Sequence, residues 1–389
     1  AGAATDGKVT VASQQLTGNA ADRTKKLGAW KSWFMLDDKI VCLGTGIKGG
    51  KGTVATTVEN ILLSKKPGEN AVKGYDVGYE EAVIDGETLP VEFDIKKEVQ
   101  NPSWAWLESN RGFLFMGENK LVAERAAEDK AFAGLSAATK NQDRTKPFMT
   151  LYLGHGQEPK NGSYAYAILP NVTKKETREK AENPGFEILE QSDSVHAIRE
   201  MKSGKILASV MKPGVNIDGF EFLTPCCVVL EPESNGSRTV YIADANQTEK
   251  TVKVVVPGNE KVTSEYLYNR TDNTVEIQVD RYYGKTYSFT YGGEGEQDSF
   301  VNSPDIVTSD LTLRCGKGVI STGLHASDLK NEGLTYSIIT PPETGKAIIN
   351  GDRLYFIPDI FVSGYENVIV IEAENKSGDR SRYKIKIYG

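Results

Sequence analysis

The sequence is poor in the residues from which metal sites and disulfide frameworks are built. Its 389 residues include four cysteines and three histidines. Cys42, Cys226, Cys227 and Cys315 are too few and too irregularly spaced for a disulfide framework or a zinc site. Cys226 and Cys227 are neighbours, so on a strand their side chains point to opposite faces. We therefore expect all four cysteines to be small core residues.

Long apolar runs and an excess of positive charge are also missing. No apolar run approaches the ~18 residues that a membrane helix needs. The N-terminus has no basic region followed by an apolar one, so any signal peptide is expected upstream of this chain. The net charge of -7 at pH 7 gives no general basic field, which argues against nucleic acid as a partner. An anionic polymer would have to meet a local positive patch.

Familiar catalytic patterns are absent as well. No serine lies in a nucleophile-elbow context, and the glycine-rich residues 48–52 lack the Gly-Lys-Ser/Thr ending of a phosphate-binding loop. His155 lies between two glycines and is expected in a turn. His196 follows Val195 in an alternating run and is expected to be a surface or hydrogen-bonded sheet residue, and His325 lies in the last part of the chain. Taken alone, the chain lacks a complete active site.

Short β-prone runs separated by turn residues recur along the whole chain. Residues 275–279, VEIQV, alternate apolar and polar side chains as a half-buried strand does. Turn dipeptides that strongly indicate β-hairpins lie between such runs at Asp85-Gly86, Asn161-Gly162, Asn235-Gly236 and Asn350-Gly351. These patterns predict an all-β protein of packed antiparallel sheets.

Two segments have the composition of helices. Residues 171–183, NVTKKETREKAEN, follow a proline and are highly charged. This pattern predicts a solvent-facing helix laid over the sheets. Residues 121–133 are the second segment for which we consider a helix.

Residues 31–47, KSWFMLDDKIVCLGTGI, form the most distinctive stretch. An aromatic run, a tight Asp37-Asp38 turn and an apolar run closed by Gly44 and Gly46 predict a β-hairpin. The hairpin would aim the glycine-rich loop of residues 48–52. Loops held on a rigid sheet are where binding groups are usually found.

Changes in composition divide the chain into four parts. We predict a large β-sandwich domain over residues 1–214, which ends at the breaker Lys212-Pro213-Gly214, and a smaller β-sandwich over residues 215–292. Residues 293–302 begin with GEGEQD and are a linker by composition. Residues 303–389 are predicted to form a separate module.

Three segments resemble a known family. KSWFMLDDKIVCLGTGI with the TTVEN that follows it, GHGQEPKNGSYAYAILPN at residues 154–171 and AGAATDGK at residues 1–8 resemble the central β-domain of the family-eight polysaccharide lyases. This family contains the hyaluronate, chondroitin AC and xanthan lyases. The resemblance covers residues 1–292 and implies a large antiparallel β-sandwich, called a supersandwich, followed by a smaller antiparallel β-sandwich.

The last module resembles a different group of proteins. Residues 334–358, LTYSIITPPETGKAIINGDRLYFIP, resemble bacterial cadherin-like or immunoglobulin-like repeats. This resemblance implies an Ig-like sandwich over residues 303–389. Such modules serve as spacers or as sugar-binding appendages, and the sequence does not choose between the two.

The lyase resemblance implies cleavage of a polysaccharide beside a uronic acid by β-elimination, with no required cofactor. The asparagine, histidine, tyrosine and arginine credited with this chemistry lie on an α/α toroid that precedes the β-domain in the family. This sequence has no such segment, so the resemblance implies no catalytic residue here but the C-terminal β portion of a longer lyase. That portion would line the cleft for an acidic polysaccharide beside its toroid partner.

The resemblance also bears on the substrate and the location. It implies a secreted or periplasmic bacterial protein and favours hyaluronan or chondroitin as the substrate. One alternative is a xanthan lyase. Another, from a different functional class, is a carbohydrate-binding or scaffold module without catalytic function.

Four residues are candidates for substrate binding. Chondroitin lyases carry a glutamate in a VETT pattern, where this sequence has Ala55. Glu59 and Asn60 match an acid and an amide of the hyaluronate branch. On a regular strand Glu59 shares a face with Ala55 but lies ~13 Å beyond it. We predict that Lys48 and Lys51 meet sugar carboxylates or sulfates and that Glu59 and Asn60 line the cleft. The alternative is that the two lysines are solvated and that Glu59 and Asn60 close a turn.

Acidic residues after Pro90 suggest a structural cation. Glu92 and Asp94 lie on one strand face, and the resemblance allows a structural calcium in this domain. Calcium takes six to eight oxygen ligands, and a third clear ligand is missing. A solvated strand face is therefore the alternative. Trp104 and Trp106, which follow, are expected to be core residues rather than a platform for a sugar ring.

Overall fold

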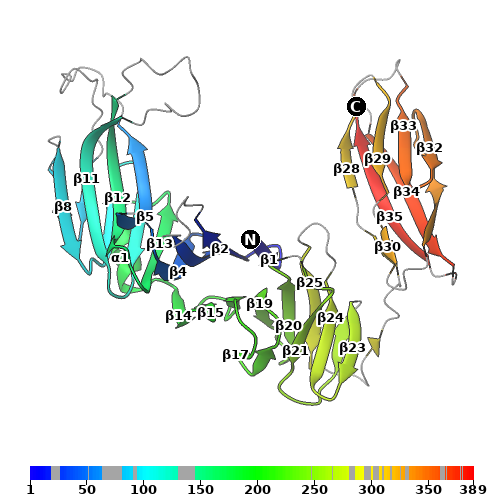
Figure 1. Cartoon of the computed structure of the whole chain (residues 1–389), viewed down its shortest axis with the longest axis horizontal. Coiled ribbons are helices and arrows are strands. Elements are labelled where there is room, and N and C mark those ends of the chain that lie inside the picture. The colour runs from blue at the N-terminus through cyan, green and yellow to red at the C-terminus, as the bar shows by residue number, and fades with distance from the viewer. Residues whose placement is uncertain are drawn as a thin grey trace. The chain divides into compact units, whose positions relative to one another are not determined.

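A computed structural model describes the chain and shows an almost entirely β protein (Figure 1). Two compact units are present: residues 1–263 with 269–298 form unit 1, and residues 264–268 with 299–389 form unit 2. The described residues are all except 19–26, 51, 64–80, 91–93, 130–144, 247, 265, 280–284, 293–298, 301–305, 309–310, 316–317, 325, 329–332, 360–363, 365, 377 and 379.

The central layer of unit 1 is a nine-stranded antiparallel sheet. Its hairpin of β3 and β4, joined at Asp37-Asp38, confirms the predicted hairpin of residues 31–47. In sheet order the strands are β1 (Gly2–Thr5), β2 (Thr10–Thr17), β3 (Gly28–Met35), β4 (Ile40–Lys48), β13 (Gly162–Pro170), β10 (Arg111–Phe115), β9 (Trp104–Leu107), β6 (Ala82–Ile84) and β7 (Glu87–Thr88).

A four-stranded antiparallel sheet covers one face of the nine-stranded sheet. Leu121, Leu151 and Leu153 project from it into a core that also contains Phe113 and Tyr164 of the nine-stranded sheet. The two sheets therefore form a sandwich, and Figure 1 shows the four outer strands side by side. In order they are β5 (Thr53–Leu62), β12 (Thr145–Gln157), β11 (Lys120–Asp129) and β8 (Ile95–Gln100).

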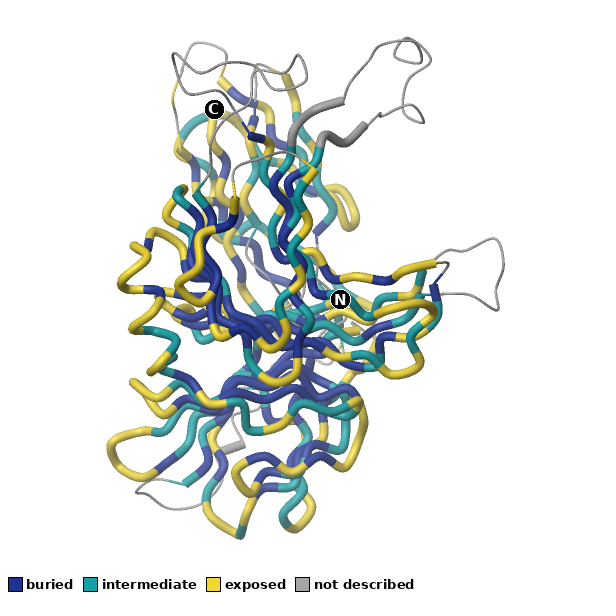
Figure 2. Tube along the Cα trace, turned by 90° about the vertical axis from the view of Figure 1, so that its left-hand side faces the viewer, coloured by how far each residue is buried: buried dark blue, intermediate teal, exposed yellow. Residues whose placement is uncertain are grey.

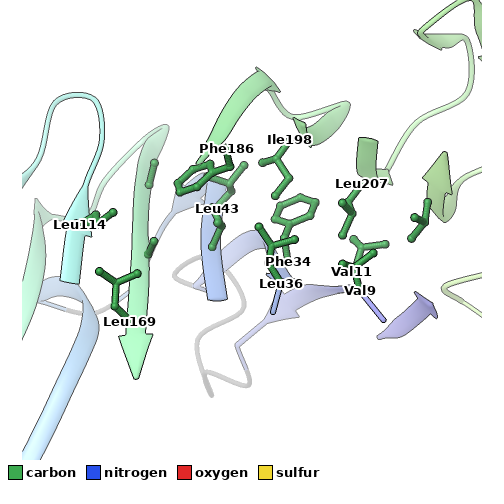
Figure 3. Close-up of a cluster of buried hydrophobic side chains, with 14 of the residues drawn as sticks. Val9, Val11, Phe34, Leu36, Leu43, Leu114, Leu169, Phe186, Ile198 and Leu207 are labelled. Atoms are coloured by element: carbon green, nitrogen blue, oxygen red, sulfur yellow. The ribbon is translucent and has the colours of Figure 1, made fainter. Parts of the chain in front are cut away.

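The opposite face of the nine-stranded sheet packs against a third sheet. Phe34 and Leu43 from the nine-stranded sheet meet Ile198 and Leu207 from the third, as Figure 3 shows. Because both faces of β4 are covered, its central residues are all buried. Figure 2 shows buried stretches of the chain in dark blue. The third sheet contains, in order, β14 (Phe186–Gln191), β15 (Val195–Glu200), β16 (Ile206–Val210), β19 (Cys226–Pro232), β20 (Arg238–Ala243), β25 (Tyr287–Tyr291) and β22 (Val262–Ser264).

A five-stranded sheet completes this part of the chain. Each of its pairings that the structure describes is antiparallel. Its strands in order are β17 (Val215–Ile217), β18 (Phe220–Phe222), β21 (Thr251–Val255), β24 (Thr274–Gln278) and β23 (Leu267–Thr271).

Two buried polar clusters link the nine-stranded sheet to the third sheet. In the first, the His196 Nδ1 lies 2.8 Å from the Ser32 Oγ, and its Nε2 lies 3.0 Å from the Thr45 Oγ1. Thr45 donates to the Ser192 carbonyl oxygen at 3.3 Å, so it accepts from the Nε2–H, while Ser32 donates to Nδ1. His196 is therefore a hydrogen-bonded, neutral sheet residue. Of the two predicted possibilities, a surface residue or a hydrogen-bonded sheet residue, the second is confirmed.

In the second cluster, Lys205, which directly precedes β16 of the third sheet, forms ion pairs with Asp6 and Glu231. Asp6 lies in the turn between β1 and β2 and also accepts hydrogen bonds from the amides of Lys8 and Val9. The side chains of Lys205 and Asp6 are 7% and 1% exposed. The first hairpin of the chain is thus fixed to the third sheet by a buried charge pair.

The segment at residues 171–183 contains a helix, as predicted. Helix α1 spans Lys174–Glu182 and begins with a capping box formed by Thr173 and Glu176. It packs against β9 and β10, where Gly112 makes room for it, since a Cβ there would lie 2.5 Å from the Thr177 Oγ1.

The prediction of a helix at residues 121–133 is wrong for the residues of this segment that the structure describes. Residues 120–129 form β11, which pairs with β12 on one side and β8 on the other. Leu121 and Ala123 alternate with Val122 and Glu124 between the two faces of the sheet. Ala, Glu and Leu favour helices locally, but pairing on both edges outweighs that weak preference.

Unit 2 is a sandwich of a four-stranded and a three-stranded sheet that share one core. Phe356, Ile371 and Ile385 are buried between them. The four-stranded sheet is β28 (Leu311–Arg314), β35 (Arg380–Tyr388), β34 (Glu366–Asn375) and β31 (Leu334–Thr340), and the three-stranded sheet is β29 (Ile320–Gly323), β33 (Arg353–Ile357) and β32 (Lys346–Asn350). The short strands β26 (Ser299–Phe300), β27 (Ile306–Thr308) and β30 (Ala326–Asp328) lie outside these sheets.

Several local predictions are confirmed. All four cysteines are buried and free. Three of the predicted turn dipeptides, Asp85-Gly86, Asn235-Gly236 and Asn350-Gly351, each connect neighbouring antiparallel strands. The hairpin predicted at Asn161-Gly162 is wrong, because this dipeptide leads from β12 of the four-stranded sheet to β13 of the nine-stranded sheet. None of the helices in the described residues is long and apolar enough to cross a membrane. The domain boundaries at residues 214, 292 and 302 stay predictions.

Candidate functional site

The glycine-rich loop carries the chain from β4 of the nine-stranded sheet to β5 of the four-stranded sheet. Gly49, Gly50 and Gly52 have φ values of 75°, 92° and 83°, which residues with side chains rarely adopt. A Cβ on Gly50 would lie 2.7 Å from the Val54 Cγ2. The Gly49 amide donates to the Pro159 carbonyl oxygen at 2.9 Å, which ties the loop to the connection between β12 and β13. The described residues of the loop therefore have a defined backbone conformation that is held to the rest of the sandwich.

Lys48 is the predicted site residue that the structure leaves available to a ligand. It ends β4, and its side chain is exposed. The stem lies over Gly28, whose missing Cβ would sit 3.7 Å from the Lys48 Cγ and Cε. No acidic partner of Lys48 is present among the residues that the structure describes. Lys51, the second predicted lysine, lies outside the described residues.

Glu59 does not share the face of Ala55 and Thr57, contrary to the expectation for a regular strand. The register of β5 against β12 shifts between the pairs Thr57–Tyr152 and Glu59–Leu151, which marks a β-bulge at Val58. The bulge turns Glu59 toward the nine-stranded sheet, where its Oε2 lies 2.7 Å from the Arg111 Nη1. Glu59 therefore joins the two sheets through an ion pair.

Asn60 lies on the outer face of the four-stranded sheet. Its Nδ2 donates to the Thr150 Oγ1 at 2.9 Å, and the residue is exposed. Seven positions separate Gly52 from Glu59, about 20 Å along a strand. The structure therefore does not gather Lys48, Glu59 and Asn60 into one cluster. The role of this group in substrate binding stays a prediction.

His155 is a strand residue, so its prediction as a turn residue is wrong. It lies within β12 at a second register shift, between Gly154 and Gly156, and is half-buried between the two sheets. Its Nε2 lies 2.8 Å from the Thr56 Oγ1. Burial and the nearby charge of Lys31 lower the pKa of the His155 imidazole below its usual range. The glycines here accommodate a bulge rather than a turn.

The predicted calcium site at Glu92 and Asp94 stays a prediction. Asp94 is exposed and has a φ of 60°, and Glu92 lies outside the described residues. Within the described part of the chain, no three His, Cys, Asp or Glu side chains gather as metal ligands would.

Trp104 and Trp106 are core residues, as predicted. Each is 8% exposed, and both belong to the core beneath the third sheet. The Trp106 Nε1 donates to the Val172 carbonyl oxygen at 2.9 Å. A sugar ring therefore has no access to either indole face in this unit.

Comparison with known families matches most of unit 1. Residues 1–181 match the profile described as polysaccharide lyase family 8, super-sandwich domain. Residues 187–253 match polysaccharide lyase family 8, C-terminal beta-sandwich domain.

Individual proteins agree with these matches. A hyaluronate lyase of Thermasporomyces composti is 30% identical over 256 residues, which is 65% of this chain and 31% of that protein. A chondroitinase-AC of Pedobacter heparinus is 25% identical over 237 residues, 58% of this chain and 30% of the relative. The solved structure of a Paenibacillus xanthan lyase has a TM-score of 0.62 at 22% identity, covering 95% of this chain and 34% of that one. The chain spans about a third of the length of each.

Proposed function

Because this chain carries the super-sandwich and C-terminal β-sandwich domains of polysaccharide lyase family 8, we propose that it forms the β portion of a lyase that cleaves a uronic-acid polysaccharide by β-elimination. In this proposal the chain lines the substrate cleft, and an N-terminal α/α toroid of the same protein carries the proton-transfer groups. The observation that carries the proposal is the match of both family domains in the family's order.

The side chains of the described residues support this division of labour. Among them, His155 is half-buried and bonded to Thr56, and His196 is sealed between Ser32 and Thr45. A histidine base must reach the proton that it removes, and the sealed ring of His196 does not. The exposed Lys48 on a shaped loop suits the binding of an anionic polymer rather than proton transfer.

An elimination assay on the complete gene product tests the proposal. β-Elimination leaves a C=C bond conjugated to the carboxylate, which absorbs in the near ultraviolet. We expect absorbance to rise with hyaluronan or chondroitin. A rise with xanthan alone would favour the xanthan lyase alternative. No product from any of the three would favour a non-catalytic carbohydrate-binding or scaffold module.

Lys48 provides a second test in the complete enzyme. We expect Lys48→Ala to raise KM for the charged polymer by about 1.5- to 5-fold at low salt, since one exposed ion pair is worth about 0.2–1 kcal/mol. The increase should shrink as added salt screens the charge. Lys175→Ala is the matched control, because Lys175 lies on α1 and is 85% exposed. Equal KM values for Lys48→Ala and the parent enzyme at low salt would show that Lys48 does not bind the polymer and that the loop is not part of the substrate cleft.

We propose further that residues 303–389 are a cadherin-like or Ig-like accessory module. The two sheets with a shared core in unit 2 and the resemblance of residues 334–358 support this proposal. A spacer and a sugar-binding appendage both fit the same sandwich. Since extracellular polysaccharides are too large to cross a membrane, the proposed activity also implies secretion or a periplasmic location.

A further inference from the structure

Three polar side chains that the proposed function does not use converge at the loop end of the sandwich in unit 1. Lys31 pairs with Gly44 across β3 and β4, and Gly44 pairs with Tyr164 across β4 and β13. Lys31, Gly44 and Tyr164 thus form one row across the nine-stranded sheet. Ser32 faces the third sheet, so Lys31, one position earlier, faces the four-stranded sheet as Tyr164 does.

Gly44 allows Tyr164 to reach toward Lys31. A Cβ on Gly44 would lie 2.2 Å and 2.4 Å from the Cε1 and Cζ atoms of Tyr164, so the tip of the ring covers this glycine. The hydroxyl group on Cζ therefore extends toward β3. Tyr164 is 3% exposed, and its hydroxyl has no hydrogen-bond partner among the described residues. The fully buried, unpaired polar atoms of the described residues do not include this hydroxyl, so water or a ligand can reach it.

His155 approaches the same place from the four-stranded sheet. Its ring centroid lies 6.2 Å from that of Tyr164. If the Thr56 hydroxyl donates to Nε2, the neutral ring carries its proton on Nδ1. No described residue hydrogen-bonds Nδ1, which lies 3.5 Å from the position of a Cβ on Gly162. The bulge at Gly154 and Gly156 places this donor between the sheets.

Lys31 supplies a positive charge to this cluster. It is half-buried, and no carboxylate in the described part of the chain pairs with it. Its charge contributes to the lowered pKa of His155. It also partly opposes the burial that raises the pKa of the Cys42 thiol. Lys31 lies on the sheet face that Cys42 and Tyr164 share, in the same row as Tyr164. A half-buried cation without a counterion favours an anionic ligand.

We propose that Lys31, Tyr164 and His155 form a binding site for an oxyanion, the carboxylate or sulfate group of an acidic sugar. The ammonium group of Lys31 neutralises the anion, and the Tyr164 hydroxyl and the His155 Nδ1–H donate hydrogen bonds to it. Lys31 and His155 are partly exposed, so solvent reaches part of each side chain. The identity of the sugar rests on the proposed function, whereas the oxyanion chemistry does not.

Histidine NMR on the chain of residues 1–389 tests the site. The chain has three histidines, and a His155→Gln variant assigns the signal of His155. We expect sodium sulfate or sodium glucuronate to raise the pKa of His155 by at least 0.3, compared with sodium chloride at equal ionic strength, because a bound anion favours the imidazolium form. The pKa of His196, which Ser32 and Thr45 seal from solvent, should not change.

Two substitutions separate binding from a general salt effect. Lys31→Gln should raise the pKa of His155 in the absence of added anion and reduce the response to sulfate or glucuronate at least threefold. Tyr164→Phe keeps the ring over Gly44. It should weaken the response of the His155 pKa to sulfate or glucuronate and leave that pKa unchanged when no anion is added. Lys175→Gln on α1 is the control and should respond as the parent chain does.

The outcomes also separate the two oxyanions and the two proposals. A response to glucuronate alone assigns a carboxylate site, and a response to sulfate alone assigns a sulfate site. Equal pKa values of His155 in sulfate, glucuronate and chloride, or a full response in folded Lys31→Gln and Tyr164→Phe variants, would overturn the site. Because this measurement needs no cleavage, a failed elimination assay would leave its result unchanged.

Discussion

Replacing Lys205 with methionine is expected to lower the free energy of unfolding of unit 1 by about 3–5 kcal/mol. The substitution keeps most of the side-chain volume but removes the cation that pairs with Asp6 and Glu231. The Asp6 side chain is 1% exposed, so its charge would stay buried without a counterion. Urea unfolding followed by tryptophan fluorescence measures the loss, since all four tryptophans lie within residues 30–106 of unit 1.

Lys202→Met is the matched control for this prediction. Lys202 lies 3.7 Å from Asp37, and the two side chains are 83% and 79% exposed, so its loss should cost less than about 1 kcal/mol. Adding Asp6→Asn to Lys205→Met should recover part of the stability, because the buried charge is then removed as well. A cost for Lys205→Met no larger than that for Lys202→Met would show that the buried pair does not stabilise unit 1.

His196 is expected to make unit 1 less stable in mild acid. Burial lowers the pKa of the His196 imidazole to about 4, partly opposed by the charge of Asp193, whereas the unfolded value is about 6.5. Above pH 6.5 the ring is neutral in both states, so the full stability is present. Between pH 6.5 and 4 the unfolded chain binds the proton and the folded chain does not, so about 3 kcal/mol is lost, and below pH 4 the loss levels off.

The measurement compares pH dependences rather than absolute stabilities. Urea unfolding of the parent chain and of His196→Gln at pH 7, 5.5 and 4 gives two slopes, and carboxylates contribute equally to both. We expect a steeper fall with decreasing pH for the parent chain. Parallel slopes would contradict the neutral, doubly hydrogen-bonded state of His196 between Ser32 and Thr45.

Local sequence patterns predict the strands of this protein well and their partners poorly. The Asp37-Asp38 hairpin and the Asn350-Gly351 turn follow from chemistry within a few residues, and the structure contains both. The pairing of β4 with β13 joins residues more than 110 positions apart, and nothing in either strand specifies the other. The helix considered at residues 121–133 fails for the same reason, because β8 and β12 decide its conformation from outside the segment.

The candidate site shows the same limit. The orientation of Glu59 depends on one extra residue, Val58, in the pairing of β5 with β12, and a period-two pattern read from β5 alone misses it. Arg111, the partner of Glu59, was therefore not among the predicted residues. Lys31 and Tyr164 lie in two of the three segments that carry the family resemblance, but only the sheet order brings them together across Gly44.

The central claim is that this chain provides a wall of the cleft while another segment moves the protons. An elimination assay run in parallel on residues 1–389 and on the complete gene product, with the same hyaluronan and chondroitin, tests it most directly. The account predicts near-ultraviolet absorbance from the complete protein and none from residues 1–389, even at high protein concentration. Unsaturated product released by residues 1–389 alone would contradict it.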